Sequence, residues 1–191
     1  MKQSQPNSSQ QKYAKGLTLI ELMISIAIMS ILITAVGPMV RDILIQNRLI
    51  GQINELSAVV QLARHSAINE QVTSIVCPSS DFTTCTADWN LPKMVFLDLD
   101  ADGIRDDNED ILGGTSRSVS NYNLSGPAGV ISFQGSGATA SPASLRLCHD
   151  SNEAGFARAL TISLQGRVRV SQDSNNDGIY ETNAGADLTC P

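Results

Sequence analysis

Four acidic side chains between residues 98 and 109 have the types and the spacing that bind a hard cation. Asp98, Asp100 and Asp102 alternate along the chain, Gly103 follows them, and Glu109 stands at position twelve counted from Asp98. Calcium loops place oxygen ligands at such positions and need a glycine at position six for the sharp turn. The pattern therefore predicts a calcium site. The alternative is an acidic hairpin turn, because the preceding MVFL run indicates a strand where an EF-hand would have a helix.

A second run of the same kind, DSNNDG, occupies residues 173–178. Its position twelve is Ala184, which offers no side-chain ligand. We therefore interpret this run as a turn, and we expect no cofactor apart from calcium at the first loop.

Two arginines near residue 168 are suited to phosphate contacts. Arg167 and Arg169 alternate along an expected strand, so both side chains project from the same face. A guanidinium group matches phosphate oxygens in a bidentate geometry. Arg158 would join the pair if the preceding strand forms a hairpin with this one. The alternative is a solvent-exposed strand face or a salt bridge, since the net charge of −6 makes the chain repel polyanions on average.

The four cysteines, Cys77, Cys85, Cys148 and Cys190, all follow the apolar N-terminal region. None has the paired Cys-x-x-Cys spacing of a zinc site. An even number of cysteines downstream of a membrane segment indicates disulfides in an oxidising compartment such as the periplasm. Four cysteines allow three pairings. We favour Cys77–Cys85 and Cys148–Cys190, with buried free thiols as the alternative.

One acidic residue lies inside the longest apolar run. Residues 17–40 carry a single charge, that of Glu21, and about 20 apolar residues are enough to cross a membrane. An ordinary secretory signal has a shorter apolar core followed by its cleavage site, whereas the small residue Gly16 precedes this run. A plain signal anchor explains the length and the three preceding lysines. It does not explain Glu21, since an acidic side chain at depth costs roughly 3 kcal/mol or more.

Cleavage between Gly16 and Leu17 would account for the acidic residue. Leu17 would then carry an α-ammonium group, and Glu21 would be the fifth residue. Positions one and five of a helix share a face, so the carboxylate can pair with an ammonium of its own chain or of a neighbour.

The stretch KGLTLIEL at residues 15–22 resembles the class III signal of type IV prepilins and type II secretion pseudopilins, although this family usually has Phe at the position of Leu17. The resemblance implies that a prepilin peptidase cuts after Gly16 and methylates the N-terminus of Leu17. It also implies that Glu21 sets the register of each subunit during assembly with other pilins and the inner-membrane assembly platform. The subunit would be held in the bacterial inner membrane with its head in the periplasm, and would move into a pilus or pseudopilus.

Further stretches resemble the GspH/FimT (FimU) branch of minor pilins and pseudopilins: ELS at 55–57, LARHSAI at 62–68, Trp89, VFLD at 95–98 and GRVR at 166–169. This resemblance implies a minor pilin or pseudopilin of a type IV pilus or a type II secretion filament. The branch includes a competence minor pilin that binds DNA. The alternative function is therefore a DNA receptor in DNA uptake, with Arg167, Arg169 and Arg158 as its candidate contacts.

We expect an α+β, pilin-like fold to position these candidate residues. In it a long N-terminal helix packs on an antiparallel β-sheet head. Apolar residues recur three or four apart beyond the membrane run, so we expect a helix from Leu17 to about Ile68, with Pro38 ending or kinking the apolar part. The expected parts are a leader at 1–16, a transmembrane helix at 17–40, its amphipathic continuation at 41–70 and a β-rich head at 71–191. Strands are predicted near 72–77, 93–98, 116–120, 129–133, 144–148, 158–164 and 167–171, and the small-residue tract 134–142 is predicted to be a mobile loop.

Catalytic residues are not indicated by the sequence. His65 and His149 are isolated from any nucleophile pattern, and there is no Ser-His-Asp, P-loop or dinucleotide signature. We therefore expect both histidines to be structural and the protein not to be an enzyme.

Overall fold

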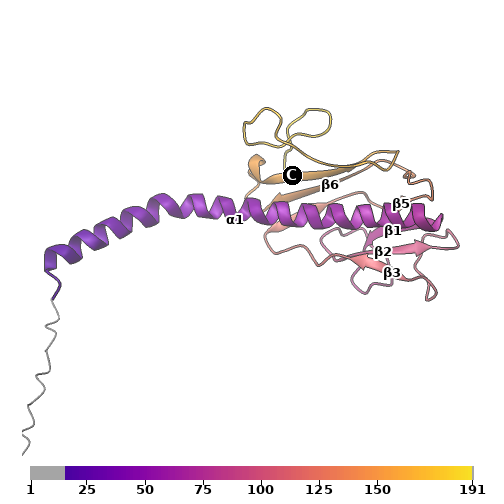
Figure 1. Cartoon of the computed structure of the whole chain (residues 1–191), viewed down its shortest axis with the longest axis horizontal. Coiled ribbons are helices and arrows are strands. Elements are labelled where there is room, and N and C mark those ends of the chain that lie inside the picture. The colour runs from indigo at the N-terminus through magenta and orange to yellow at the C-terminus, as the bar shows by residue number, and fades with distance from the viewer. Residues whose placement is uncertain (1–15, 191) are drawn as a thin grey trace, which may run out of the picture. The chain divides into compact units, whose positions relative to one another are not determined.

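The computed structural model describes residues 16–190 (Figure 1). The predicted leader, residues 1–16, lies outside this range except for Gly16. The chain divides into two compact units, Met1–Asp42 and Ile43–Pro191, and each is described by itself.

A single helix, α1 (Leu19–Glu70), runs through both units and has clear signals at its two ends. Thr18 caps the start, because its hydroxyl oxygen accepts a hydrogen bond from the Glu21 N–H at 3.2 Å. Gln71 has a left-handed backbone, with φ of 57°, and its side-chain amide donates to the carbonyl oxygen of Ile68 at 2.6 Å. A left-handed residue after the last turn is a common way to end a helix. Pro38 lies inside α1, so it does not end the helix.

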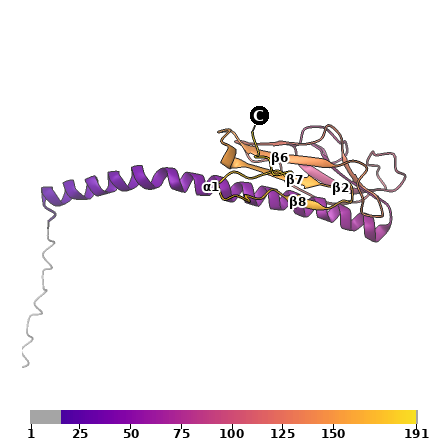
Figure 2. The same ribbon diagram turned by 90° about the horizontal axis from the view of Figure 1, so that it is seen from above.

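Eight strands form two antiparallel sheets in the second unit (Figures 1 and 2). The first sheet has the order β3-β2-β1-β5 and the second β4-β6-β7-β8. Their bounds are β1 Thr73–Pro78, β2 Lys93–Asp98, β3 Ile111–Gly114, β4 Tyr122–Ser125, β5 Ile131–Phe133, β6 Ala143–His149, β7 Ala157–Ile162 and β8 Val168–Val170.

One hydrophobic core joins both sheets to the part of α1 in this unit. The helix contributes buried side chains spaced three or four residues apart, from Ile45 to Ala67. Val76 and Phe133 of the first sheet and Leu145 and Leu160 of the second belong to the same cluster. Each sheet therefore buries one face against the helix, as the α+β expectation requires.

Two of the strands were not predicted, and one predicted strand is absent. The expected strand at 116–120 is wrong: this segment is attached by separate contacts, such as the Ser116 N–H to a carboxylate oxygen of Glu55 and the Ser118 N–H to the Asn90 carbonyl oxygen. β3 and β4 were missed. β3 carries two glycines and pairs with β2 through a shifted register, features that weaken a strand pattern.

The tract 134–142 makes a tight turn that packs on the end of α1. The Gly137 N–H donates to the Gln134 carbonyl oxygen at 2.7 Å. Thr139 is buried, and its hydroxyl donates to the Ser163 carbonyl oxygen at 3.1 Å. A side chain at Gly135 would meet the backbone of Gln71. Small residues are thus required here by close packing, a reason that their composition alone does not reveal.

Two disulfides join Cys77 to Cys85 and Cys148 to Cys190. They are the two pairings favoured from the sequence. The first closes a loop of 8 residues after β1, and the second spans 42 residues and fastens the C-terminal segment to β6. Leu188 is buried next to this second disulfide, so the C-terminal segment covers the outer side of the second sheet.

Candidate functional site

The N-terminal part of α1 presents a mostly apolar surface. Residues 16–42 are all exposed, and, within the part of the chain that the structure describes, α1 is long and apolar enough to cross a membrane. Glu21 lies in its first turn, two residues after the helix begins. Gly16 and Leu17 precede the helix.

The hydroxyl groups of Ser25, Ser30 and Thr34 are hydrogen-bonded within the helix itself. The hydroxyl of Ser25 donates to the Glu21 carbonyl oxygen at 2.7 Å, that of Ser30 to Ala27 at 2.8 Å, and that of Thr34 to Ser30 at 3.0 Å. Hydroxyls bonded in this way need no water. The segment is therefore compatible with a lipid bilayer or with the dry centre of a filament.

The predicted arginine pair is exposed on the second sheet. Arg167 comes just before β8 and Arg169 lies within it, whereas Val168 and Val170 between and after them pack on the core. Both guanidinium groups therefore lie on the side away from the core. With Arg64 and His65 of α1 they line a depression of about 260 Å³.

Arg158 does not join this pair, so that part of the prediction is wrong. β7 and β8 do form the expected hairpin, in which Thr161 stands opposite Arg169. Arg158 lies three positions before Thr161, so its side chain leaves the opposite face of the strand. It is buried, and its Nη1 donates to the carbonyl oxygens of Gly155 at 3.1 Å and Ala157 at 2.7 Å. Burial lowers the pKa of this guanidinium.

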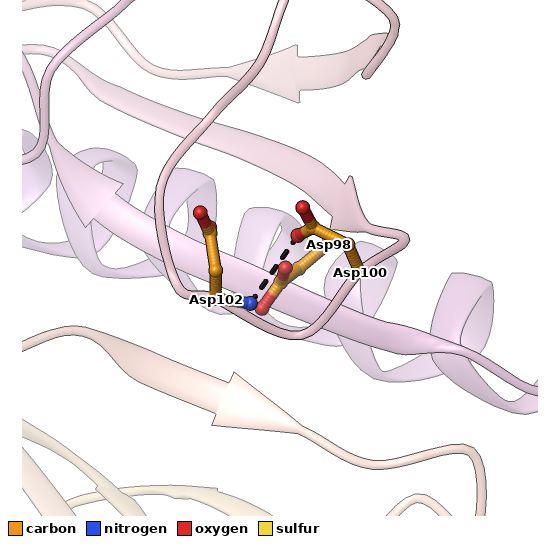
Figure 3. A group of neighbouring side chains, drawn as sticks. All are labelled: Asp98, Asp100 and Asp102. Atoms are coloured by element: carbon orange, nitrogen blue, oxygen red, sulfur yellow. Dashed lines mark hydrogen bonds between the residues drawn. The ribbon is translucent and has the colours of Figure 1, made fainter.

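The acidic loop follows directly from β2. Asp98 is the last residue of that strand, and one carboxylate oxygen from each of Asp98, Asp100 and Asp102 lies within 4.8 Å of the others (Figure 3). Asp98 Oδ2 accepts the Gly103 N–H at 3.2 Å. Burial raises the pKa of Asp98, and the negative charge of Glu109 raises it as well.

Glu109 is buried but stands apart from this trio. One of its oxygens accepts the Leu99 N–H at 2.6 Å and the other accepts the Asp106 N–H at 3.1 Å. The glutamate predicted as a ligand thus connects the beginning of the loop to its later part.

The run at 173–178 folds into the same turn as the run at 98–103. In both, the sixth-position glycine donates to the first aspartate, at 3.0 Å from Gly178 to Asp173. In both, the fourth residue is left-handed: Ala101 and Asn176 each have φ of 63°.

A buried glutamate also closes the second turn. Glu181 Oε2 accepts the Ser174 N–H at 2.8 Å, which corresponds to the bond between Glu109 and Leu99. This residue was missed because it stands at position nine, whereas the calcium pattern requires an acid at position twelve. The D-x-[DN]-x-D-G spacing, which occurs twice in the sequence, was the signal that could have located this second turn and the glutamate that closes it.

The two histidines have different surroundings. His149 packs edge-on between Tyr122 and Phe156, with ring centres 5.0 and 6.0 Å away, and its Nδ1 lies 3.1 Å from the hydroxyl oxygen of Ser151. It has a structural role. His65 is exposed beside Arg64 in the depression described above.

These features define a class of protein: an apolar N-terminal helix whose continuation packs against antiparallel sheets is the fold of the pilins. Solved structures agree. The type IV minor pilin FimU of Pseudomonas aeruginosa is 18% identical, with a TM-score of 0.54 over 66% of this chain and 90% of that one. A second crystal form of it gives 0.50 at 18% identity, over 66% and 92%. The minor pseudopilin EpsH of the Vibrio cholerae type 2 secretion system gives 0.46 at 16% identity, over 61% and 90%. At 18% identity the likeness to the two FimU structures shows the fold alone.

The family is shown by sequence models. The model of the type II transport protein GspH matches residues 52–166, and the prokaryotic N-terminal methylation motif matches residues 11–37. No match was found among curated proteins. The chain belongs to the GspH family. It is a minor pilin or pseudopilin of a type IV pilus or a type II secretion system, a structural subunit that assembles with other pilins in a filament and not an enzyme.

Proposed function

We propose that this subunit is made as a prepilin and assembles through a charge pair created by its own processing. A prepilin peptidase removes residues 1–16, cutting between Gly16 and Leu17, and methylates the Leu17 amino group. The processed subunit waits in the bacterial inner membrane, with residues 17–40 as the membrane segment, 41–70 as the amphipathic continuation and 71–191 as the periplasmic head. It then passes to the assembly platform.

Glu21 is the observation that carries this proposal. It is the single charge in residues 17–40, and a lone carboxylate inside a membrane is costly unless it is paired. The ammonium group of a processed neighbour supplies that pair when subunits pack side by side. Since the hydroxyls of this segment are already bonded within α1, the carboxylate is the polar group that still gains from assembly.

Replacing Glu21 with alanine tests the proposal. We expect Glu21→Ala to insert and to be cleaved, with removal of residues 1–16 and one added methyl group seen by mass spectrometry, yet to be missing from the sheared filament fraction. Asp42→Ala is the control, because it removes an acid from α1 outside the apolar run. Normal assembly of Glu21→Ala would show that the charge pair is not needed. Loss of pili or of protein secretion on deletion of the gene tells the two filament systems apart.

A second candidate function is DNA binding at a pilus tip. Its one favouring observation is that Arg167 and Arg169 are exposed on the same side and line a depression with Arg64. We expect DNA retention that falls steeply with salt and that Arg167→Ala with Arg169→Ala abolishes. Arg117→Ala, which removes an exposed arginine elsewhere, should leave retention unchanged. Absence of retention at low salt would exclude this function.

A further inference from the structure

The loop after β2 contains a buried carboxylate oxygen that lacks a partner. Asp98 is only 4% exposed. Its Oδ2 accepts the Gly103 N–H, but its Oδ1 has no hydrogen-bond donor among the described residues. Leaving a buried charged group unsatisfied is costly, so this oxygen points to a partner that the protein itself does not supply.

The neighbours of this oxygen are further carboxylates. Asp100 and Asp102 lie on the inside of the loop with Asp98 (Figure 3), and one oxygen of each lies within 4.8 Å of the others. Three negative groups at this spacing repel one another. A cation therefore suits this oxygen better than a neutral hydrogen-bond donor does. Asp100 and Asp102 are exposed, and an ion can therefore enter from solvent.

The donors select the type of ion. Residues 98–109 include no histidine or cysteine, the ligands that zinc and other transition metals prefer. Calcium takes six to eight oxygen ligands in a flexible geometry, whereas magnesium demands a near-ideal octahedron and keeps most of its water. An irregular, solvent-open loop of carboxylates suits calcium better.

We infer that Asp98, Asp100 and Asp102 bind one calcium ion at the end of β2. In loops of this spacing the carbonyl oxygen of position seven, here Ile104, is a further ligand, and water completes the shell. Glu109 is a positioning residue in this site: both of its oxygens hold backbone N–H groups of the loop. The ion binds in a loop whose backbone is already held by these hydrogen bonds, and it fixes the connection between β2 and β3.

The turn at 173–178 provides an internal comparison. It shares the backbone conformation of the calcium loop, but Asp173 is only half-buried and position three is Asn175. A variant in that turn therefore tests whether binding needs the carboxylate trio or merely an Asp-Gly turn.

Calorimetric titration of the full chain, purified in detergent and stripped with a chelator, tests the inference. We expect one calcium ion per chain and a higher unfolding temperature in calcium than in chelator, followed by the fluorescence of Trp89. Asp100→Asn with Asp102→Asn should weaken binding at least tenfold and remove the temperature shift. Both residues are exposed and the substitutions remove two mutually repelling charges, so this variant should unfold at or above the wild-type temperature in chelator, which separates lost binding from lost folding.

Two control variants keep the result specific. Asp106→Asn with Asp107→Asn removes two charges from the same loop outside the trio, and Asp173→Asn with Asp177→Asn changes the second turn. Both should bind calcium within about threefold of wild type. The inference is overturned if millimolar calcium gives no binding, if magnesium binds equally well, or if either control loses as much affinity as the trio variant.

Discussion

The guanidinium carbon of Arg158 lies 3.4 Å from the centre of the Tyr180 ring. Arg158 belongs to β7, and Tyr180 belongs to the segment after β8. The same guanidinium bonds the carbonyl oxygens of Gly155 and Ala157. A positive group stacked on an aromatic face and bonded to backbone carbonyls fastens the C-terminal segment to the second sheet.

We expect Arg158→Ala to lower the free energy of unfolding by about 3 kcal/mol, since it removes a cation–π contact and leaves two carbonyls without their donor. Tyr180→Phe keeps the ring and should change stability by less than about 1 kcal/mol. Denaturant unfolding followed by the fluorescence of Trp89, the only tryptophan, measures both. Equal losses in the two variants would show that the tyrosine hydroxyl, and not the stacked ring, is what matters.

Lys93 makes stability depend on pH. It is 3% exposed, and burial lowers its pKa from 10.5 to about 8, although Glu55 and Asp88 act in the opposite direction. Between these two values the unfolded chain holds a proton that the folded chain has released, so stability rises with pH. The slope is at most about 1.4 kcal/mol per pH unit.

Comparing wild type with Lys93→Met from pH 7.5 to 9.5 isolates this effect. The free energy of unfolding of wild type, relative to that of Lys93→Met, should rise as the pH rises, because only wild type has the buried lysine. The range stops at 9.5 because burial raises the pKa of Tyr122, and its ionisation would reduce stability at higher pH. A difference that stays constant with pH would show that Lys93 titrates normally.

The two disulfides should differ in their contributions to stability. Closing a loop restricts the unfolded chain more when the loop is longer, which gives about 4 kcal/mol for Cys148–Cys190 and about 2.5 kcal/mol for Cys77–Cys85. Replacing each pair with alanines and measuring denaturant unfolding checks the order. A larger loss from the short loop would mean that local packing outweighs chain entropy.

Gly166 should not tolerate a side chain. Its φ is +71°, and a Cβ atom there would overlap the carbonyl oxygen of Gly137. Gly166→Ala should therefore cost about 2 to 3 kcal/mol or more. Gly129→Ala is the matched control, because a Cβ at Gly129 meets nothing within 4 Å. If both variants have the same free energy of unfolding, the turn between β7 and β8 can change its backbone conformation to accommodate the added Cβ atom.

The sequence predicted the elements that follow a strong pattern. The helix extends to Glu70, two residues beyond the expected end, and β1, β2, β6 and β7 lie within about two residues of their predictions. In α1, apolar side chains at a regular spacing face the core, and the four strands are short runs of mostly buried residues, β1 and β2 being buried on both faces, so pattern and packing agree. β4 has only four residues, two of them exposed, and its pairing with β6 is a long-range contact that no local pattern shows.

The residues of the candidate sites also divide into those placed by local sequence and those placed by long-range contacts of the fold. Asp98, Asp100 and Asp102 come together because a glycine-containing turn determines their positions locally. The roles of Glu109 and Arg158 depend on which backbone groups the fold brings near them. Arg158 in particular was predicted to join the arginine pair through the expected hairpin, whereas it stacks on Tyr180, 22 residues further along.

The burial of Lys93 has a practical consequence for mapping the neighbours of this subunit. It is the only lysine after Lys15, and its side chain is almost fully enclosed. Amine-reactive cross-linkers should leave the β-rich part of the chain unmarked, while exposed carboxylates offer many attachment points. Cleavage would remove the three leader lysines, Lys2, Lys12 and Lys15, so the loss of their labelling would report processing.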